Sequence, residues 1–349
     1  MRIIVAQTAF LGDVVLTTPV FAALKRHWPT ADITAWVRPE AADLLREHPH
    51  VAATLADDKR GADRGLSGLL HVARRIHAGR FDLAVAVHKS FRTALLLAAA
   101  RVPRRVGFRS AAGNWLYHRR VDRNPALHEL ERNLSIVDGL GLDSKYESSQ
   151  PLLTVATAAR RAVDCLLREA DITNASSVVG LAPGSVWPTK RWTPDGFAAI
   201  AAEMRRRGYD VLLLGAPNEA SIAQDVNRLA GGVAVNLVGR TDVATLVAAI
   251  ARCRAVVCND SAPMHIANAL NVPVVAIFGP THPKLGFAPR GDRAMVVERD
   301  LDCRPCGTHG HTQCPIGTHA CMRELAPTAV LAALDRLLAS PPERQHSLT

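Results

Sequence analysis

The residues from Ala255 to Leu270 have the types and spacing of a phosphate-binding corner. The apolar run Ala255–Cys258 predicts a buried strand of a parallel sheet. Asp260 and Ser261 follow as N-cap types, and Pro263 suits the first turn of a helix. A helix N-terminus beside the carboxyl end of a strand offers backbone N–H groups and partial positive charge to an anion. Capping of the helix alone is about as well supported by these residue types as phosphate binding.

Three segments resemble a known family. Asn259–His265, with the sequence Asn-Asp-Ser-Ala-Pro-Met-His, resembles the donor-binding motif of glycosyltransferase family 9, the heptosyltransferases of lipopolysaccharide core assembly. Ala182–Trp192 is similar to the nucleotide-sugar loop of that family, nearest its type II branch. Gly12-Asp13 with Thr17–Pro19 is similar to its N-terminal signature. Ala262 stands where the family usually has glycine, which alters how closely the backbone can approach a phosphate.

The resemblance implies a fold and a reaction. The fold is GT-B, two Rossmann-like α/β domains with parallel sheets that face each other across a central cleft. Residues 1–150 would bind the acceptor, residues 151–339 would bind the nucleotide sugar, and residues 340–349 are expected to be disordered. The reaction is an inverting, metal-independent transfer of heptose from ADP-heptose to a heptose or Kdo of a phosphorylated lipid A core precursor. The expected donor-binding residues are Gly184, Ser185, Thr189, Lys190, Glu219, Asp260, Ser261, Ala262, Met264 and His265.

Three of these residues also have structural interpretations. Lys190 is expected to be catalytic, because a point charge beside the diphosphate stabilises the leaving group, although a loop lysine is ordinarily solvated. Glu219 follows a strand-like run and is equally consistent with binding ribose hydroxyls and with stabilising a helix N-terminus. For His265 the motif favours a diphosphate contact over packing in the core.

Asp13 follows the first expected strand and a short loop, at the carboxyl edge of the N-terminal sheet. Spacing alone favours a cap on a helix that starts near Val14. The match to the family signature implies instead that Asp13 is the general base, which takes the proton of the acceptor hydroxyl. Such assistance gives about 10²–10⁴-fold in rate.

Basic residues of the first half suit a phosphorylated acceptor. Lys89 and Arg92 follow the expected strand Leu83–Val87 and are predicted to bind the acceptor. Further arginines add positive charge but are individually more typical of solvated surface: Arg101, Arg104, Arg105, Arg109, Arg119 and Arg120.

Four of the seven cysteines lie close together, at Cys303, Cys306, Cys314 and Cys321, among several histidines. Their types and pairing predict a structural zinc site as one interpretation, although the spacing is irregular for a zinc ribbon. Reduced thiols or an adventitious disulfide are the alternatives. No cofactor is expected to be required for catalysis.

Composition bounds the class of protein. A chain of 349 residues suggests two domains, and 48% hydrophobic with 21% charged residues is typical of a globular protein. Residues 1–150 hold 22 Lys/Arg and 15 Asp/Glu, a net +7 of the total +10. The longest apolar run, Ala94–Ala100, cannot span a bilayer, and the N-terminus lacks the pattern of a signal peptide. We expect a cytoplasmic protein at the inner face of the inner membrane.

Alternating strand and helix patterns appear twice along the chain. In the first half strands are expected at Ile3–Ala6, Ile33–Val37, Ala52–Leu55 and Leu83–Val87, with helices at Val14–His27, Pro39–Arg46, Leu66–His77, Ser90–Ala100 and His128–Leu140. In the second half strands are expected at Val178–Ala182, Val211–Leu214, Ala255–Cys258 and Val274–Phe278, with helices at Pro194–Arg207, Glu219–Leu229, Asp242–Ala251 and Pro327–Leu338.

Two other functions are weighed against heptosyl transfer. Another nucleotide-sugar transferase on the same scaffold is the alternative within the class. A basic nucleic-acid-binding protein is the alternative from another class, since the basic half and the Cys/His segment suit it. Aromatic residues make up only 5% of the chain, which disfavours a stacking platform for single strands, so no nucleic-acid partner is expected. Neither a dinucleotide-binding glycine motif nor a Walker motif is present.

Overall fold

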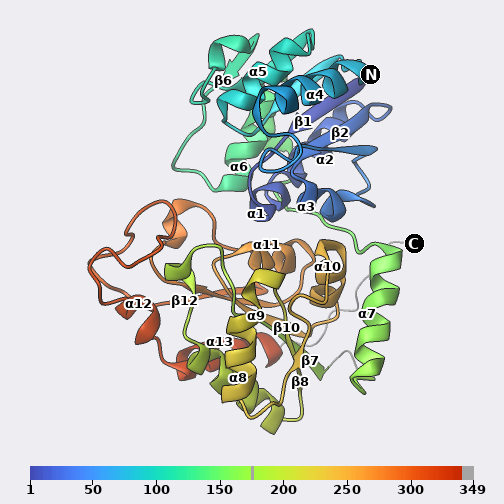
Figure 1. Ribbon diagram of the computed structural model, residues 1–349. Helices are drawn as coiled ribbons and strands as arrows, with labels where there is room; N and C mark the ends of the chain where they lie inside the picture. Colours follow the sequence, from blue (N-terminus) through green and yellow to red (C-terminus); the bar gives the residue numbers. More distant parts are fainter. Residues whose placement is uncertain (174–176, 340–349) are drawn as a thin grey trace. The chain divides into compact units, whose positions relative to one another are not determined.

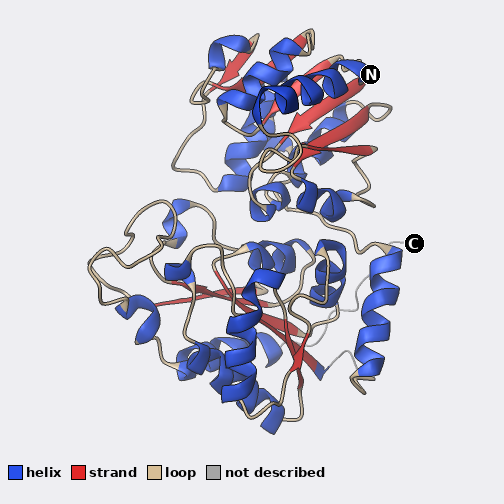
Figure 2. Cartoon of the chain, in the orientation of Figure 1, coloured by secondary structure: helices blue, strands red, loops and turns tan. Residues whose placement is uncertain are grey.

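The computed structural model describes residues 1–173 and 177–339, and the chain divides into two compact units, Met1–Thr154 and Val155–Thr349. Each unit contains a six-stranded parallel sheet with helices packed on it (Figures 1 and 2). The predicted class, two Rossmann-like α/β units, is therefore confirmed. The predicted tail, residues 340–349, lies outside the described residues.

The sheet of the first unit has its first strand near the centre. The strand order is β3-β2-β1-β4-β5-β6, and each neighbouring pair is parallel. The strands are β1 Arg2–Ala6, β2 Asp32–Val37, β3 Ala53–Ala56, β4 Leu83–Ala86, β5 Arg104–Phe108 and β6 Arg119–Val121. Because the order reverses at β1, the carboxyl ends of β1 and β4 flank the position where such sheets bind ligands.

The second unit repeats this topology. Its strand order is β12-β11-β10-β7-β8-β9, again with every neighbouring pair parallel. The strands are β7 Val178–Ala182, β8 Asp210–Leu213, β9 Val235–Asn236, β10 Ala255–Asn259, β11 Val274–Phe278 and β12 Ala294–Glu298. The order reverses at β7, so the carboxyl ends of β7 and β10 mark the expected binding position of this sheet.

The helices lie between the strands, as crossovers that a parallel sheet requires, or before the first or after the last strand of a unit. In the first unit they are α1 Leu11–Val15, α2 Thr18–His27, α3 Pro39–Ala42, α4 Gly65–Ala78, α5 Phe91–Ala99 and α6 Glu129–Leu134. In the second unit they are α7 Thr157–Glu169, α8 Pro194–Arg206, α9 Ala220–Leu229, α10 Val243–Ala251, α11 Ala262–Ala269, α12 Ala320–Arg323 and α13 Pro327–Ala339.

The central strands are apolar runs because both of their faces are covered. Every residue of β7, β10 and β11 is buried. This pattern is typical of parallel strands between two helical layers. Large side chains fill the space between sheet and helices, among them Trp36 and Phe108 in the first unit and Trp192 and Phe197 in the second.

The structure corrects three predicted helices and adds strands. The helix expected at Pro39–Arg46 is α3 followed by the 3₁₀ helix Asp43–Leu45. The single helix expected at Val14–His27 is two helices, because the chain turns between α1 and α2, and Pro19 lies in the first turn of α2. The helix expected at His128–Leu140 is α6 followed by the 3₁₀ helix Ser135–Leu140. Strands β5, β6, β9 and β12 were not expected. All four begin or end in polar residues or lie at a sheet edge, which weakens the apolar pattern that marks a strand.

Candidate active site

Two loops and a helix meet at the carboxyl ends of β7 and β10 in the second unit. The loop after β7 leads into the 3₁₀ helix Pro188–Lys190, and β10 leads through Asp260 and Ser261 into α11. Because these strands are neighbours at the point where the strand order reverses, both loops lie at the position where open α/β sheets bind nucleotides.

Asn259, the last residue of β10, ties the two loops together. Its side chain is fully buried, and its Nδ2 donates to the carbonyl oxygens of Pro183 at 2.8 Å and Gly184 at 3.3 Å. Its Oδ1 accepts from the backbone N–H of Trp192 at 2.9 Å. The indole of Trp192 in turn donates to the Leu325 carbonyl at 3.1 Å. Asn259 therefore fixes the loop after β7 against the end of β10.

Lys190 and Asp260 form an ion pair at this corner. Lys190 Nζ lies 2.6 Å from Asp260 Oδ2, and only 13% and 6% of the two side chains are exposed. Thr281 Oγ1 donates to the same carboxylate oxygen at 2.7 Å. Lys190 is thus not a solvated loop lysine, and Asp260 does not serve merely as a helix cap. An ammonium group has three N–H donors, so Lys190 can keep this contact and still donate to a bound anion.

The start of α11 carries the remaining predicted residues of this motif. Ser261 is the N-cap, yet its side chain makes no capping hydrogen bond and instead lies 3.3 Å from the Asn259 carbonyl. Ala262 is half-buried and begins the helix. Met264 is wholly buried and His265 nearly so. The side chain of Met264 therefore packs in the core. If Met264 binds the donor, as predicted, it does so through its backbone.

Gly184 and Glu219 lie against each other. A Cβ added at Gly184 would meet the Glu219 carboxylate carbon at 2.0 Å, so only glycine fits here while Glu219 keeps its place. Glu219 accepts from the backbone N–H of Ala216 at 2.8 Å, the contact expected of an acid at a helix N-terminus. Burial raises the pKa of Glu219, while the bond from Ala216 and the charge of Arg191 lower it.

Ser185 and Thr189 differ in what surrounds them. Ser185 is buried, and its carbonyl accepts from Arg191 Nε at 2.8 Å. The Thr189 hydroxyl donates to the His311 carbonyl at 2.9 Å and accepts from the His311 N–H at 2.7 Å. The Thr189 carbonyl accepts from His319 Nε2 at 2.8 Å. In this structure Thr189 therefore fastens the 3₁₀ helix Pro188–Lys190 to the Cys/His loop, residues 303–321.

Asp13 lies in the first unit, on α1 beyond the carboxyl end of β1. It occupies the third position of the helix, which begins at Leu11 rather than near Val14. Its Oδ2 accepts from the backbone N–H of Phe10 at 3.1 Å. Burial raises the pKa of Asp13 from 3.8 to about 6, with Glu129 raising it further and the Phe10 bond and Arg123 lowering it. A carboxylate with this pKa is ionised at pH 7 and suited to accept a proton.

Charged residues that the sequence did not mark out accompany Asp13. Glu129 at the start of α6 is buried, and both of its carboxylate oxygens accept from Arg123. Arg132, one turn along, donates to Glu129 at 3.2 Å. Lys89 is exposed, and its charge interacts with those of Arg123, Glu129, Arg132 and Asp13. Partial desolvation and the two arginines lower the pKa of Lys89, while the two carboxylates raise it. Asp13 and Lys89, predicted separately, thus belong to one charged cluster.

Arg92, the other predicted acceptor residue, is held inside the first unit. Its Nη2 donates to Asp57 at 2.8 Å and to the Asp63 carbonyl at 3.0 Å, and its Nε donates to Asp57 at 3.2 Å. Asp57 is almost completely buried. The guanidinium therefore serves a structural ion pair, and contact with an acceptor stays a prediction.

The four clustered cysteines do not form a metal site in the described residues. Within residues 1–173 and 177–339, no three His, Cys, Asp or Glu side chains are grouped so as to hold an ion. Cys303, Cys306, Cys314 and Cys321 are free thiols. The Cys314 sulfur accepts from the backbone N–H of His319 at 3.3 Å. Zinc binding at these four cysteines stays a prediction.

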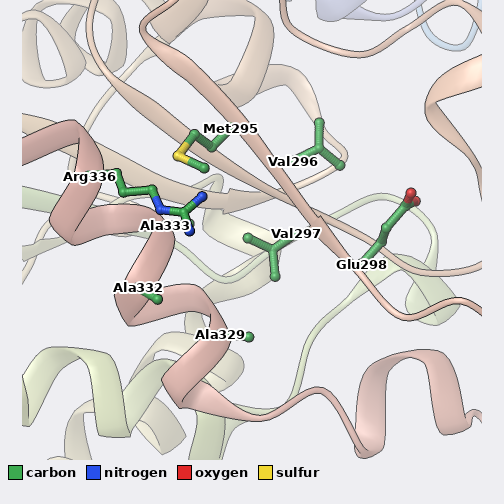
Figure 3. Close-up of a pocket in the computed structure, with 8 residues that line it drawn as sticks. All are labelled: Met295, Val296, Val297, Glu298, Ala329, Ala332, Ala333 and Arg336. Atoms are coloured by element: carbon green, nitrogen blue, oxygen red, sulfur yellow. The ribbon is translucent and has the colours of Figure 1, made fainter.

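A separate pocket of about 280 Å³ lies between edge strand β12 and helix α13 (Figure 3). Alanines of α13 and residues of β12 line it, with Glu298 and Arg336 at its two ends. None of the predicted site residues borders this pocket. The predicted site residues therefore lie elsewhere, at the corner of β7 and β10 in the second unit and, separately, in the Asp13 cluster of the first unit.

Comparison with known proteins decides the family. The model of glycosyltransferase family 9 (heptosyltransferase) matches residues 69–316. This chain belongs to that family. The family 9 chain is 26% identical to lipopolysaccharide heptosyltransferase 2 of Salmonella typhimurium, over 97% of this chain and 99% of the relative. It is equally 26% identical to lipopolysaccharide heptosyltransferase 2 of Escherichia coli K12, with the same coverage. The predicted family is confirmed.

Solved structures agree on the fold of this family 9 chain. A glycosyl transferase family 9 protein of Veillonella parvula superposes with a TM-score of 0.84 at 25% identity, covering 97% of each chain. The Escherichia coli ADP-heptose lps heptosyltransferase II superposes with a TM-score of 0.77 at 24% identity, covering 97% of this chain and 99% of that one. These neighbours support assignment of the GT-B class.

The sequence predicted the residues at the ends of the strands but missed those that orient them. Asn259 stands inside the quoted motif, and its position at the end of an apolar strand was the available signal. Arg123, Glu129 and Arg132 gave no comparable signal, because their pairing depends on how the loop before α6 folds back.

Proposed function

We propose that this family 9 glycosyltransferase transfers a heptose from ADP-heptose to a heptose or Kdo of a lipopolysaccharide core precursor, with inversion at the anomeric carbon. The observation that carries the proposal is the ion pair of Lys190 and Asp260 at the carboxyl ends of β7 and β10, beside the N-terminus of α11. The names of the curated relatives support the sugar and the acceptor class.

The second unit binds the donor. The ADP diphosphate lies at the start of α11, where backbone N–H groups and Lys190 Nζ meet its negative charge. Asp260, itself held by Thr281, fixes the ammonium group before the donor arrives, so little reorganisation is needed when charge develops on the leaving oxygen. These groups provide the positive potential that a metal ion would otherwise supply, and the transfer is therefore metal-independent.

Asp13 is the general base. The acceptor hydroxyl oxygen attacks the anomeric carbon from the face opposite ADP, and the bond between that carbon and the diphosphate oxygen breaks. The bonding electrons leave with ADP, and the hydroxyl proton passes to Asp13. A pKa raised to about 6 by burial supports this role, because the carboxylate is ionised at neutral pH and still a useful base.

The acceptor is a phosphorylated lipid, and the enzyme works at the cytoplasmic surface of the inner membrane. The basic first unit supports this, and Lys89, an exposed lysine of that unit, is the residue that we expect to meet an anionic acceptor. No helix among the described residues is long and apolar enough to cross a membrane.

The test is a transfer assay with ADP-heptose and defined core acceptors. ADP release that depends on both substrates, with a product one heptose heavier and of inverted anomeric configuration by NMR, is the expected result. ADP release without acceptor, or retention of configuration, contradicts the proposal. Lys145→Ala is the matched control for Lys190→Ala, because Lys145 is an exposed lysine on a 3₁₀ helix of the first unit.

Ligand-dependent melting separates this function from nucleic-acid binding. ADP at about 100 times its Kd stabilises the folded state by about 2.7 kcal/mol and should raise the melting temperature. Oligonucleotides at low salt should not. The reverse result favours the nucleic-acid alternative.

A further inference from the structure

The first unit exposes large apolar side chains on adjacent helices. Leu66 and Leu70 of α4 are 74% and 50% exposed, and Phe91 and Leu95 of α5 are 47% and 37% exposed. Trp115, on the short 3₁₀ helix Asn114–Leu116, is 66% exposed. We call these five residues the α4–α5 face.

These residues form one surface rather than isolated positions. Helices α4 and α5 pack side by side, and α5 also contacts the helix that carries Trp115. In each helix the two exposed residues are four apart, so they lie on one side of it. The rings of Phe91 and Trp115 are 6.1 Å apart. Exposed large apolar side chains gathered on one surface are typical of an interaction site.

The same stretch of chain is strongly basic. Residues 59–123, which include α4, α5, β5 and β6, hold 15 Lys/Arg against 3 Asp/Glu, a net charge of +12. The whole chain carries only +10, so the remainder is slightly acidic. Arg64 precedes α4, Arg74 continues the row of Leu66 and Leu70, and Arg101 follows α5; all three are exposed.

We propose that the α4–α5 face docks on the surface of an anionic lipid bilayer. Leucine, phenylalanine and tryptophan side chains enter the boundary between head groups and acyl chains, while the surrounding arginines contact lipid phosphates. Charge selects this occupant, because a second copy of the chain would bring two strongly positive faces together. A nucleic acid would satisfy the charge but leave the leucines without an apolar partner.

The inference deepens the proposed function by naming the surface that brings the enzyme to a lipid acceptor. It is tested without the sugar donor, so its failure would leave the transfer reaction untouched. Likewise, loss of transfer in an active-site variant would leave vesicle binding unchanged.

The experiment measures co-sedimentation of the full chain with vesicles of phosphatidylcholine alone or mixed with phosphatidylglycerol. Binding is expected only with phosphatidylglycerol, and should weaken as salt rises. The triple variant Leu70→Ser, Phe91→Ser, Trp115→Ser should bind at least about tenfold more weakly. The matched control is Tyr146→Ser, Leu229→Ser, Ile316→Ser, which removes three exposed apolar side chains from other places and should bind as the wild type does.

A second variant keeps the test decisive if the triple variant folds poorly. Arg64→Gln, Arg74→Gln, Arg101→Gln removes three charges and no apolar surface, and should also weaken binding to phosphatidylglycerol vesicles. Transfer to a soluble, delipidated acceptor should keep its rate in both variants. Wild-type protein that ignores anionic vesicles, or variants that bind them fully, would overturn the proposal. So would a dimer in sedimentation velocity that the triple variant dissociates.

Discussion

The role of Asp13 can be tested through the pH dependence of transfer. With a pKa of about 6, the carboxylate is about 90% ionised at pH 7 and about 10% ionised at pH 5. If Asp13 is the base, kcat/KM should fall about tenfold per pH unit below pH 6. A carboxylate with the ordinary value of 3.8 would keep the rate level to about pH 4.

The variant Asp13→Asn separates catalysis from stability. Its turnover should fall by about 10²–10⁴-fold, and the acid limb of the profile should disappear. The variant should also be more stable at pH 7 to 8. A folded-state pKa above the unfolded value means that stability is fully present below pH 3.8 and is lost as pH rises through about 6. At 1.36 kcal/mol per pKa unit, the ionised carboxylate lowers the free energy of unfolding by at most about 3 kcal/mol. The actual cost is smaller, because Asp13 is only half-buried and solvent screens its charge.

A purely structural role predicts the opposite sign. A carboxylate that only stabilises the start of α1 contributes about 0.3–1 kcal/mol, which the amide would lose. Melting temperatures at pH 8 and pH 4, with kcat/KM over the same range, distinguish the two. The base assignment is refuted if Asp13→Asn keeps its turnover, and the raised pKa is refuted if the variant melts lower than wild type at pH 8.

The remaining predictions concern the second unit. Lys190→Ala should weaken ADP binding, measured by isothermal titration, and slow transfer, measured by ADP release, each by about 10–100-fold, because a hydrogen bond to a charged group contributes about 1.5–3 kcal/mol. The same variant should have a lower melting temperature, since Asp260 is left buried without its partner. Lys190→Met with Asp260→Asn should recover much of that stability but not the ADP affinity. In His319→Asn the side chain is too short to reach the Thr189 carbonyl, and the KM for donor should rise about fivefold. In His319→Gln the side-chain amide can reach that carbonyl, and the KM should be close to that of the wild type. The kcat should change little in both variants. Transfer should continue in EDTA without added magnesium, and activity that returns only with a metal ion would contradict the proposed electrostatics.

Residues that directly follow strands were the most predictable from sequence. Apolar runs locate β7 and β10, and the resemblance of the segments after these strands to the family motifs placed Lys190 and Asp260 in one site although 70 positions separate them. Their ion pair could not be predicted. It depends on β7 and β10 being neighbours in the sheet, which follows from the strand order and not from the residues themselves.

Side chains that act through other side chains were the least predictable. Glu129 reads as a surface acid at a helix start, yet it is buried because Arg123 and Arg132 neutralise it from two directions. Asp13 illustrates the same limit, since an error of three residues in the start of α1 changes a helix cap into a half-buried carboxylate. Burial, and hence pKa, is set by tertiary packing that spacing does not encode.

Thr189 was predicted to bind the donor, and in the structure its hydroxyl bonds to the Cys/His loop. The resemblance places it among the donor ligands, but its hydroxyl already donates to and accepts from the His311 backbone. A hydroxyl has one proton, so this one cannot donate to a phosphate without giving up its bond to the His311 carbonyl. His319 holds the adjacent carbonyl from the same loop. We therefore expect the Cys/His loop to contribute to donor binding indirectly, by fixing the backbone that carries Lys190.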